Sequence, residues 1–150
     1  MNSNIDNLYR QVIMEHHKNP RNKGLVDDET YHMLHLKNPS CGDDIKVQVK
    51  FENDKLVDIR HNGTGCSICC SSASVMSEVL KHKTKEEANL VIEDFFRLIK
   101  GEAPLDEEAL DEAIVYSGVA KFPARVKCAT LAWKAVGAVI VGDQGEQIDG

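Results

Sequence analysis

Three cysteine-bearing segments, far apart in the chain, constrain this sequence more than any other feature. Each segment places one cysteine among small, turn-forming or basic residues: residues 38–43 (NPSCGD), 63–66 (GTGC) and 122–128 (FPARVKC). Thiolates bind zinc, copper(I) and iron–sulfur clusters strongly, and a nearby carboxylate can complete a tetrahedral shell that three sulfurs leave open. The sequence therefore predicts a fold that brings Cys41, Cys66 and Cys128 to one metal or sulfur site.

Length and composition bound the setting of this site. With 150 residues and 42% apolar content, the chain can bury one core, so we expect a single domain over residues 1–150. No apolar run approaches the roughly 20 residues of a membrane-spanning helix, and the polar N-terminus lacks the apolar segment of a secretion signal. We therefore expect a cytoplasmic protein with no membrane partner. Five cysteines in that reducing compartment favour metal-binding or reactive thiols over a disulfide framework.

The net charge argues against nucleic acid as a partner. Binding along a phosphate backbone needs a clustered basic surface, whereas this chain has a formal net charge of −6. We expect no nucleic-acid partner.

Hydrophobic periodicity predicts an α+β fold with a three-stranded antiparallel sheet packed against several helices. Apolar residues at helical spacing up to Ile13 predict a first helix that ends before Pro20 and packs on the sheet. Three short β patterns follow at about 31–36, 45–51 and 56–61, joined by connections of hairpin length. These three patterns predict a β-meander.

The direction of travel along such a meander gives a geometric prediction. The end of its first strand, the start of its second and the end of its third lie at one edge of the sheet. Cys41, Asp43 and Cys66 would meet there. A helical pattern begins just after Cys66, and a helix N-terminus stabilises a thiolate. Gly63 and Gly65 would permit an unusual backbone path at this point.

The second half of the chain reads as helical. Apolar spacing from Ala88 to Ile99 predicts one helix, and residues 102–112 form an acidic stretch that we expect to be a solvated surface with a short helix. The final helix is predicted to open at Pro123, which places Cys128 in its early turns beside Arg125 and Lys127.

Several of these residues also allow simpler interpretations. Cys128 taken alone could be a small buried hydrophobic residue, and a packing role is the default interpretation of Cys69 and Cys70. Cys66 and Cys69 also form a CxxC motif, which resembles a thioredoxin-like redox pair. His61 could replace Asp43 as a metal ligand. The other five histidines, at positions 16, 17, 32, 35 and 82, are expected at the surface or at edges.

Taken together, the motifs resemble the IscU/SufU family of iron–sulfur cluster assembly proteins, and within it the SufU branch. The resemblance rests on the three cysteine segments and on LYRQVIM at 8–14 and KNPRN at 18–22, so it covers nearly the whole chain. Lys127 precedes Cys128 where IscU-type scaffolds carry a histidine, and the chain lacks their Leu-Pro-Pro-Val-Lys segment. Both departures favour the SufU branch, whose fold is of the IscU/SufE-like type.

The resemblance implies a zinc-bound, sulfurtransferase-like sulfur acceptor that works with a SufS-type cysteine desulfurase. That partner, not this chain, carries the pyridoxal phosphate, and the sulfur passes on to a downstream iron–sulfur assembly scaffold. The zinc ligands implied by the family are Cys41, Asp43, Cys66 and Cys128. By the same resemblance Cys41 would accept the sulfur as a persulfide, with Arg125 and Lys127 at the border of the site.

Zinc keeps thiolates deprotonated but makes them less nucleophilic, so sulfur transfer is expected to need one ligand to leave transiently. Cys41 is the expected one, because it lies in a hairpin loop beside Gly42. Two alternatives share the pocket. The first is a scaffold on which a [2Fe–2S] cluster is assembled, with iron in place of zinc. The second is a purely structural zinc module.

Overall fold

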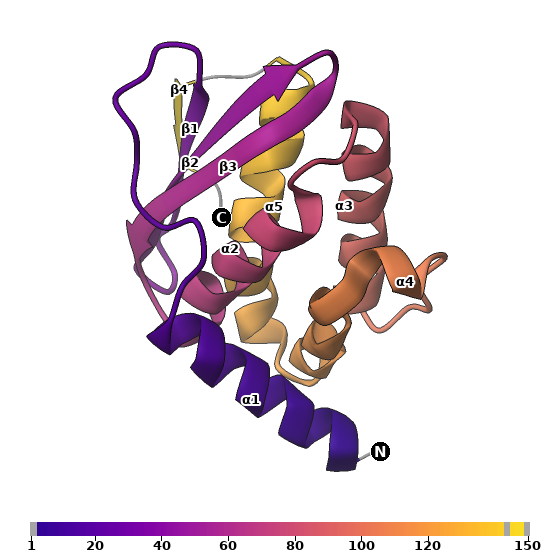
Figure 1. The fold of residues 1–150 in the computed structure, drawn as a ribbon. Coiled ribbons are helices and arrows are strands. Elements are labelled where there is room, and N and C mark those ends of the chain that lie inside the picture. The colour runs from indigo at the N-terminus through magenta and orange to yellow at the C-terminus, as the bar shows by residue number, and fades with distance from the viewer. Residues whose placement is uncertain (1–2, 143–144, 149–150) are drawn as a thin grey trace.

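The computed structural model describes residues 3–142 and 145–148, which form a sheet with helices packed on it in layers (Figure 1). The elements along the chain are α1 (Ser3–Lys18), β1 (His32–Asn38), β2 (Asp43–Glu52), β3 (Lys55–Thr64), α2 (Ser67–Leu80), α3 (Lys85–Ile99), α4 (Glu107–Leu110), the 3-10 helix η1 (Asp111–Lys121), α5 (Pro123–Ile140) and β4 (Gly145–Ile148).

The sheet has the strand order β3-β2-β1-β4, and the first three strands form the predicted antiparallel meander. Alternation explains its two faces, since Ile45, Val47 and Val49 of β2 are buried while Lys46 between them is exposed. The predicted three-stranded sheet is extended by β4, which runs parallel to β1. No sequence pattern predicts β4, because its four residues GEQI lack an alternating apolar pattern and take strand form only by pairing with the free edge of β1.

Two helices form the layer next to the sheet. α5 packs against β1 and β2, and α2 packs against β3 and α5. α1 lies on α2 and η1, so the prediction that its apolar stripe packs on the sheet was wrong. The sheet face is already covered by α2 and α5, which leaves α1 to bury its stripe against helices. α3 packs on α5 and η1 on the far side of this layer (Figure 1).

The helix ends follow the local sequence. Thr84 caps α3 through a capping box with Glu87, and Pro123 occupies the first turn of α5, where a missing N–H costs little. The acidic stretch forms α4 and the start of η1, and most of its carboxylates are exposed as expected. Glu112 lies 2.7 Å from the ring of His16, which is fully buried, so the expectation of a surface position for His16 was wrong.

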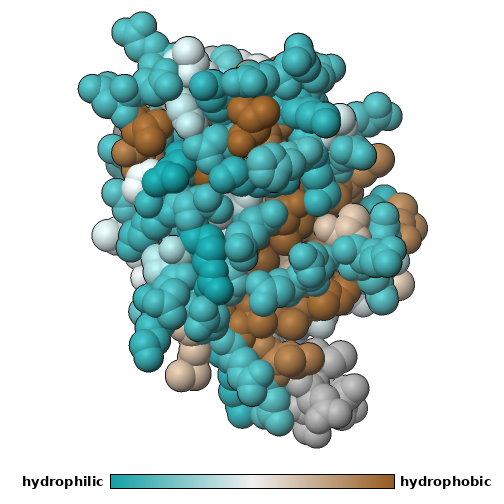
Figure 2. Space-filling model, in the orientation of Figure 1, coloured by the Kyte–Doolittle hydropathy of each residue, from teal (hydrophilic) through white to brown (hydrophobic). Residues whose placement is uncertain are grey.

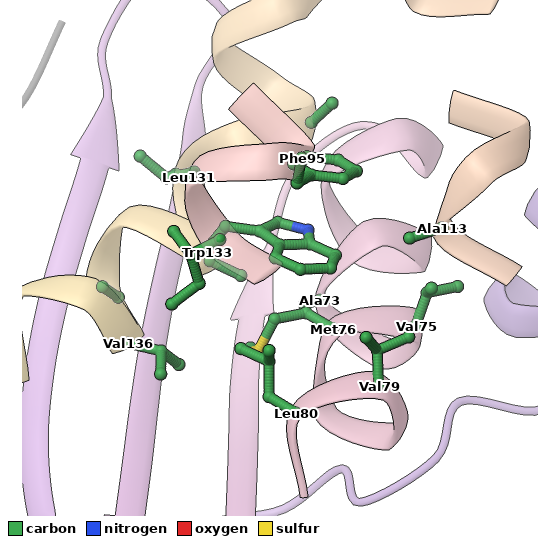
Figure 3. Close-up of a cluster of buried hydrophobic side chains, with 14 of the residues drawn as sticks. Ala73, Val75, Met76, Val79, Leu80, Phe95, Ala113, Leu131, Trp133 and Val136 are labelled. Atoms are coloured by element: carbon green, nitrogen blue, oxygen red, sulfur yellow. The ribbon is translucent and has the colours of Figure 1, made fainter. Parts of the chain in front are cut away.

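The core lies between the sheet and the outer helices, and aliphatic side chains surround Phe95 and Trp133 within it (Figure 3). The rings of Phe95 and Trp133 stack with centroids 4.0 Å apart and planes at 6°, and Tyr116 meets Phe95 edge-on. All three side chains are fully buried. Such pairs add to the stabilisation that burial alone provides.

The outer surface is mainly hydrophilic, with hydrophobic residues gathered in an uneven band between polar ones on the face that Figure 2 shows. Within the described ranges, every helix is too short or too polar to cross a bilayer.

Candidate metal centre

The end of β1, the start of β2 and the end of β3 lie at one edge of the sheet, as the meander prediction required. Asn38 at the end of β1 pairs with Asp43 at the start of β2, and Asp44 pairs with Thr64 at the end of β3. The turn between β1 and β2 is held by the Asn38 carbonyl, which accepts hydrogen bonds from the backbone N–H groups of Cys41 (3.2 Å) and Gly42 (2.9 Å). This turn presents Cys41 at the same edge as the chain entering α2.

The N-termini of α2 and α5 meet this edge of the sheet. Cys66 is the N-cap residue of α2, and Cys128 lies in the second turn of α5, fully buried. The Cys41 thiol donates to the carbonyl of Ala124 in the first turn of α5, at 3.8 Å. Three segments that are distant in sequence therefore converge, as their cysteines predicted.

Three of the four predicted ligands form one donor group. The sulfur atoms of Cys41 and Cys128 and a carboxylate oxygen of Asp43 all lie within 4.8 Å of one another. Within the described part of the chain, this group does not include the sulfur of Cys66. Cys66 is nevertheless adjacent, because its backbone N–H donates to Asp43 Oδ1 at 3.0 Å and its side chain hydrogen-bonds with the Cys128 thiol.

Gly65 makes the contact between Cys66 and Asp43 possible. A Cβ atom at position 65 would lie 2.4 Å from Asp43 Oδ1, closer than real Cβ contacts allow. Only glycine lets the backbone approach the carboxylate so closely, which is the physical reason for the GC pair at the start of α2. The unusual backbone path predicted from the glycines is present.

The electrostatics of the cluster fit a cation. Burial raises the pKa of the Cys128 thiol strongly, and hydrogen bonds with Asp43 and Cys41 raise it further. Alone, this thiol stays protonated at neutral pH, whereas a divalent cation would hold it as thiolate. A set of two or three sulfurs and one carboxylate oxygen suits zinc or an iron–sulfur cluster better than a hard cation such as calcium.

Arg125 lies at the rim of this cluster. Its side chain is exposed, and a hydrogen bond to the Cys128 sulfur, together with the nearby Cys66 and Cys128 thiols, raises the pKa of the guanidinium further. A permanent positive charge therefore borders the sulfurs on the solvent side.

Asn38 is a site residue that the sequence reasoning missed. Its Nδ2 lies 3.4 Å from Asp43 Oδ2 and 3.8 Å from the sulfur of Cys128, and its side chain is buried. One signal could have found it. Asn38 continues the buried stripe of Leu34 and Leu36 along β1, and a polar residue in such a stripe needs a polar partner.

The remaining cysteines and His61 lie outside the donor group. Cys69 is buried in the core, in agreement with its packing role, and Cys70 is half-buried with its thiol directed to the Gly65 carbonyl. His61 is buried, and its Nε2 donates to the carbonyl of Arg21 at 2.7 Å. The alternative in which His61 replaces Asp43 as a ligand is therefore wrong.

The chain is similar in sequence to a known protein family and to characterised proteins. The model of the family described as NifU-like N terminal domain matches residues 8–129. The zinc-dependent sulfurtransferase SufU of Bacillus subtilis (strain 168) is 42% identical over 144 residues, covering 96% of this chain and 97% of that protein. The iron–sulfur cluster assembly scaffold protein IscU of Streptococcus pyogenes serotype M1 is 40% identical, covering 89% of this chain and 83% of that protein.

A solved structure shares the fold. The crystal structure of a protein described as hypothetical, at 2.3 Å resolution, superposes with a TM-score of 0.83 and 40% sequence identity. The match covers 91% of this chain and 98% of the other.

Proposed function

Because the chain belongs to the family of NifU-like N-terminal domains, with SufU and IscU proteins among its relatives, we propose that it is a zinc-bound sulfur acceptor for iron–sulfur cluster assembly. The resemblance to the IscU/SufU family is thereby confirmed, while the sulfur-acceptor role is our proposal. The observation that carries it is the convergence of two thiols and one carboxylate within 4.8 Å, with Cys66 beside them.

Cys41, Asp43 and Cys128, with Cys66 as fourth ligand, would hold the zinc. When bound, zinc supplies positive charge that keeps the thiols deprotonated at neutral pH and protects them from oxidation. The residues of the chain do the rest. The Asp43 carboxylate is fixed by the Cys66 N–H, and Arg125 adds a positive charge at the rim for an incoming anionic sulfur group.

Cys41 is the proposed sulfur acceptor. It is half-buried in a four-residue turn, whereas Cys128 is fully buried within α5. A SufS-type desulfurase would present a cysteine persulfide formed with its own pyridoxal phosphate. The Cys41 sulfur attacks the outer sulfur of that persulfide, the S–S bond of the desulfurase breaks, and its cysteine leaves as a thiolate. Cys41 then carries the persulfide to a downstream assembly scaffold in the cytoplasm.

The direct test measures sulfur on Cys41. The purified protein is incubated with a SufS-type desulfurase and L-cysteine, and persulfide is located by mass spectrometry of alkylated peptides while desulfurase turnover is recorded. We expect a persulfide on Cys41 and faster turnover. Cys41→Ser should lose both, and Cys70→Ser is the matched control, because Cys70 is also half-buried but lies outside the donor group. A Cys41→Ser protein that still stimulated turnover would refute the role of Cys41.

Metal content separates the proposal from its two alternatives. Colourless protein with about one zinc per chain, isolated without added iron, supports the sulfur acceptor. Brown protein with a sulfur-to-iron charge-transfer spectrum supports a scaffold for a [2Fe–2S] cluster. Bound zinc without any stimulation of the desulfurase supports a structural module.

A further inference from the structure

The side chain of Asn38 lies directly against the candidate metal centre. It is 1% exposed, and it stands at the last position of β1, directly before the turn that carries Cys41. Its Nδ2 faces Asp43 Oδ2 at 3.4 Å and Cys128 Sγ at 3.8 Å. Its backbone carbonyl holds the turn itself. Asn38 therefore contacts two of the three segments that supply ligands: its own turn, with Cys41 and Asp43, and α5, with Cys128.

The other half of the same amide has no partner. Among the buried side-chain nitrogen and oxygen atoms of the described residues, Asn38 Oδ1 alone lacks a hydrogen bond. A buried carbonyl oxygen without a donor is unfavourable, and such groups are rare in native proteins. A rotation of the amide by 180° would exchange the positions of Oδ1 and the NH₂ group. The observed orientation of the Asn38 amide therefore needs a physical reason.

The two neighbours of the amide provide that reason. A carboxylate and a thiolate accept hydrogen bonds and donate none, so an amide oxygen turned toward them would be repelled by both. With Nδ2 toward them, the amide donates to two groups that are anionic whenever a cation is bound. This orientation of the amide suits a metal-loaded site, although it leaves Oδ1 without a hydrogen bond.

The Asp43 carboxylate is consequently held from two sides. Its Oδ1 accepts from the backbone N–H of Cys66, at the start of α2, and its Oδ2 accepts from Asn38 on β1. Groups that hydrogen-bond to metal ligands fix their orientation, and their loss commonly weakens metal binding.

We infer that Asn38 is a positioning residue of the metal centre: its side-chain amide holds the Asp43 carboxylate and the Cys128 sulfur in place for the cation. It is not itself a ligand in this inference. The inference rests on the metal-binding part of the proposed function and is independent of which protein donates the sulfur.

The test compares zinc affinity with the stability of the metal-free protein in two variants. Asn38→Leu keeps the branched shape and the number of heavy atoms of the side chain but removes the amide, and Asn38→Ala removes both the branch and the amide. We expect the zinc Kd, measured by competition with a chromophoric chelator, to rise about 10–100-fold in each variant. The metal-free Asn38→Leu protein should unfold at the same urea concentration as the parent or a higher one, because it no longer buries an unpaired carbonyl.

Gln48→Leu is the matched control. Gln48 is also a buried amide of the sheet, and it forms two 2.9 Å hydrogen bonds with the backbone of Val26, far from the donor group. Its replacement should lower stability and leave the zinc Kd unchanged. Co²⁺ provides a second readout, since the visible bands of the Co²⁺-loaded protein should change in both Asn38 variants and remain as in the parent in Gln48→Leu.

Two outcomes would overturn the inference. The first is a zinc Kd in both Asn38 variants equal to that of the parent. The second is an equal loss of affinity in Gln48→Leu, which would indicate a general effect of buried amides. A parent protein that bound no zinc would refute the proposed function together with the inference, whereas tight zinc binding by parent and Asn38 variants alike would refute the inference alone.

Discussion

The aromatic core around Phe95, Tyr116 and Trp133 and the candidate metal centre share the helices α2 and α5, but they are completed in different ways. α2 and α5 carry Cys66 and Cys128 near their N-termini and core residues such as Met76 and Trp133 further along (Figure 3). In the core, the Trp133 N–H and the Tyr116 hydroxyl each have a hydrogen-bond partner within the protein. Trp133 Nε1 donates to Ser72 Oγ at 2.9 Å, and Ser72 Oγ donates to the carbonyl of Ala129 at 2.6 Å.

The metal centre, by contrast, gathers groups that the protein alone does not complete. The Cys128 thiol is buried beside the Asp43 carboxylate, burial raises its pKa, and a bound cation would be needed to hold it as thiolate. The core is complete without a ligand and the metal centre is not. We therefore expect the fold to form without the metal, while the chemistry of the site should depend on it.

The largest expected effect tests the core. Trp133→Ala removes a fully buried ring that stacks on Phe95, and we expect a loss of about 3–5 kcal/mol in the free energy of unfolding. The loss should be the same with zinc as with a chelator, measured by urea unfolding, because the ring makes no contribution to the donor group. A loss that appeared only in the zinc-loaded protein would break the division between the two regions.

Removal of the metal tests whether the fold is independent of the metal centre. The chelated protein should still unfold cooperatively, because its core is intact. Free zinc at 100 times its Kd should add about 2.7 kcal/mol to the stability. Asp43→Asn, which keeps the carbonyl oxygen that accepts from Cys66, should lose most of this increment without a matching loss of metal-free stability. A chelated parent that showed no cooperative unfolding, as in small zinc modules, would contradict the comparison.

A smaller effect is expected where the two helices join. Ser72→Ala leaves the Trp133 N–H and the Ala129 carbonyl without their shared partner, so we expect a loss of about 1–3 kcal/mol. The zinc increment should stay as in the parent, since Ser72 lies more than one turn beyond Cys66 on α2. If Ser72→Ala weakened zinc binding, the relative placement of α2 and α5 would itself depend on this hydrogen bond, and the two regions would be coupled.

The sequence predicted most of this architecture because the relevant signals are local. Periodicity gave the helices and the meander, and the direction of the strands placed Cys41, Asp43 and Cys66 at one edge. Pro123 located the start of α5, and the helical pattern that begins after Cys66 located the start of α2. Each of these signals acts within a few residues, so it survives without knowledge of the tertiary structure.

The parts that were missed depend on tertiary packing. β4 exists because β1 has a free edge, and α1 avoids the sheet because α2 and α5 cover it first. His16 is buried by contacts with α2 and η1 that lie more than 50 residues away in sequence. Asn38 had a local signal in the stripe of β1, but its partner Cys128 is 90 residues distant, and only the folded chain joins them.

The smallest expected effect concerns a polar contact of the sheet that is complete without any ligand. The Tyr31 hydroxyl donates to Asp58 Oδ2 at 2.5 Å, and Lys81 lies 3.2 Å from the same carboxylate. Burial alone raises the pKa of Asp58, but the hydrogen bonds from Tyr31 and Lys81 outweigh it and lower the pKa. The bond to Asp58, with burial, raises the pKa of Tyr31 from 10.0 to about 12.

The signs of these two shifts predict the pH dependence. A lowered pKa of Asp58 in the folded state stabilises the protein above the unfolded value, near 4, and that stabilisation is lost as the pH falls through the folded pKa. A raised pKa of Tyr31 stabilises the protein below pH 10, and the loss runs from about pH 10 to 12.

Tyr31→Phe should weaken the pH dependence of stability on both the acid and the alkaline side. At neutral pH it should lower the free energy of unfolding by less than about 1 kcal/mol, because the pair is partly exposed. Urea unfolding of parent and variant from acid to alkaline pH measures this effect, with a chelator and with zinc. The difference between the two proteins should be the same in both series at neutral and alkaline pH, since this contact needs no metal. Parallel pH curves for parent and variant would show that the hydrogen bond does not couple the two titrations. If the two proteins differed in stability at neutral pH only when zinc was bound, the sheet would depend on the metal centre. The independence from metal that we expect of the core would then not extend to the sheet.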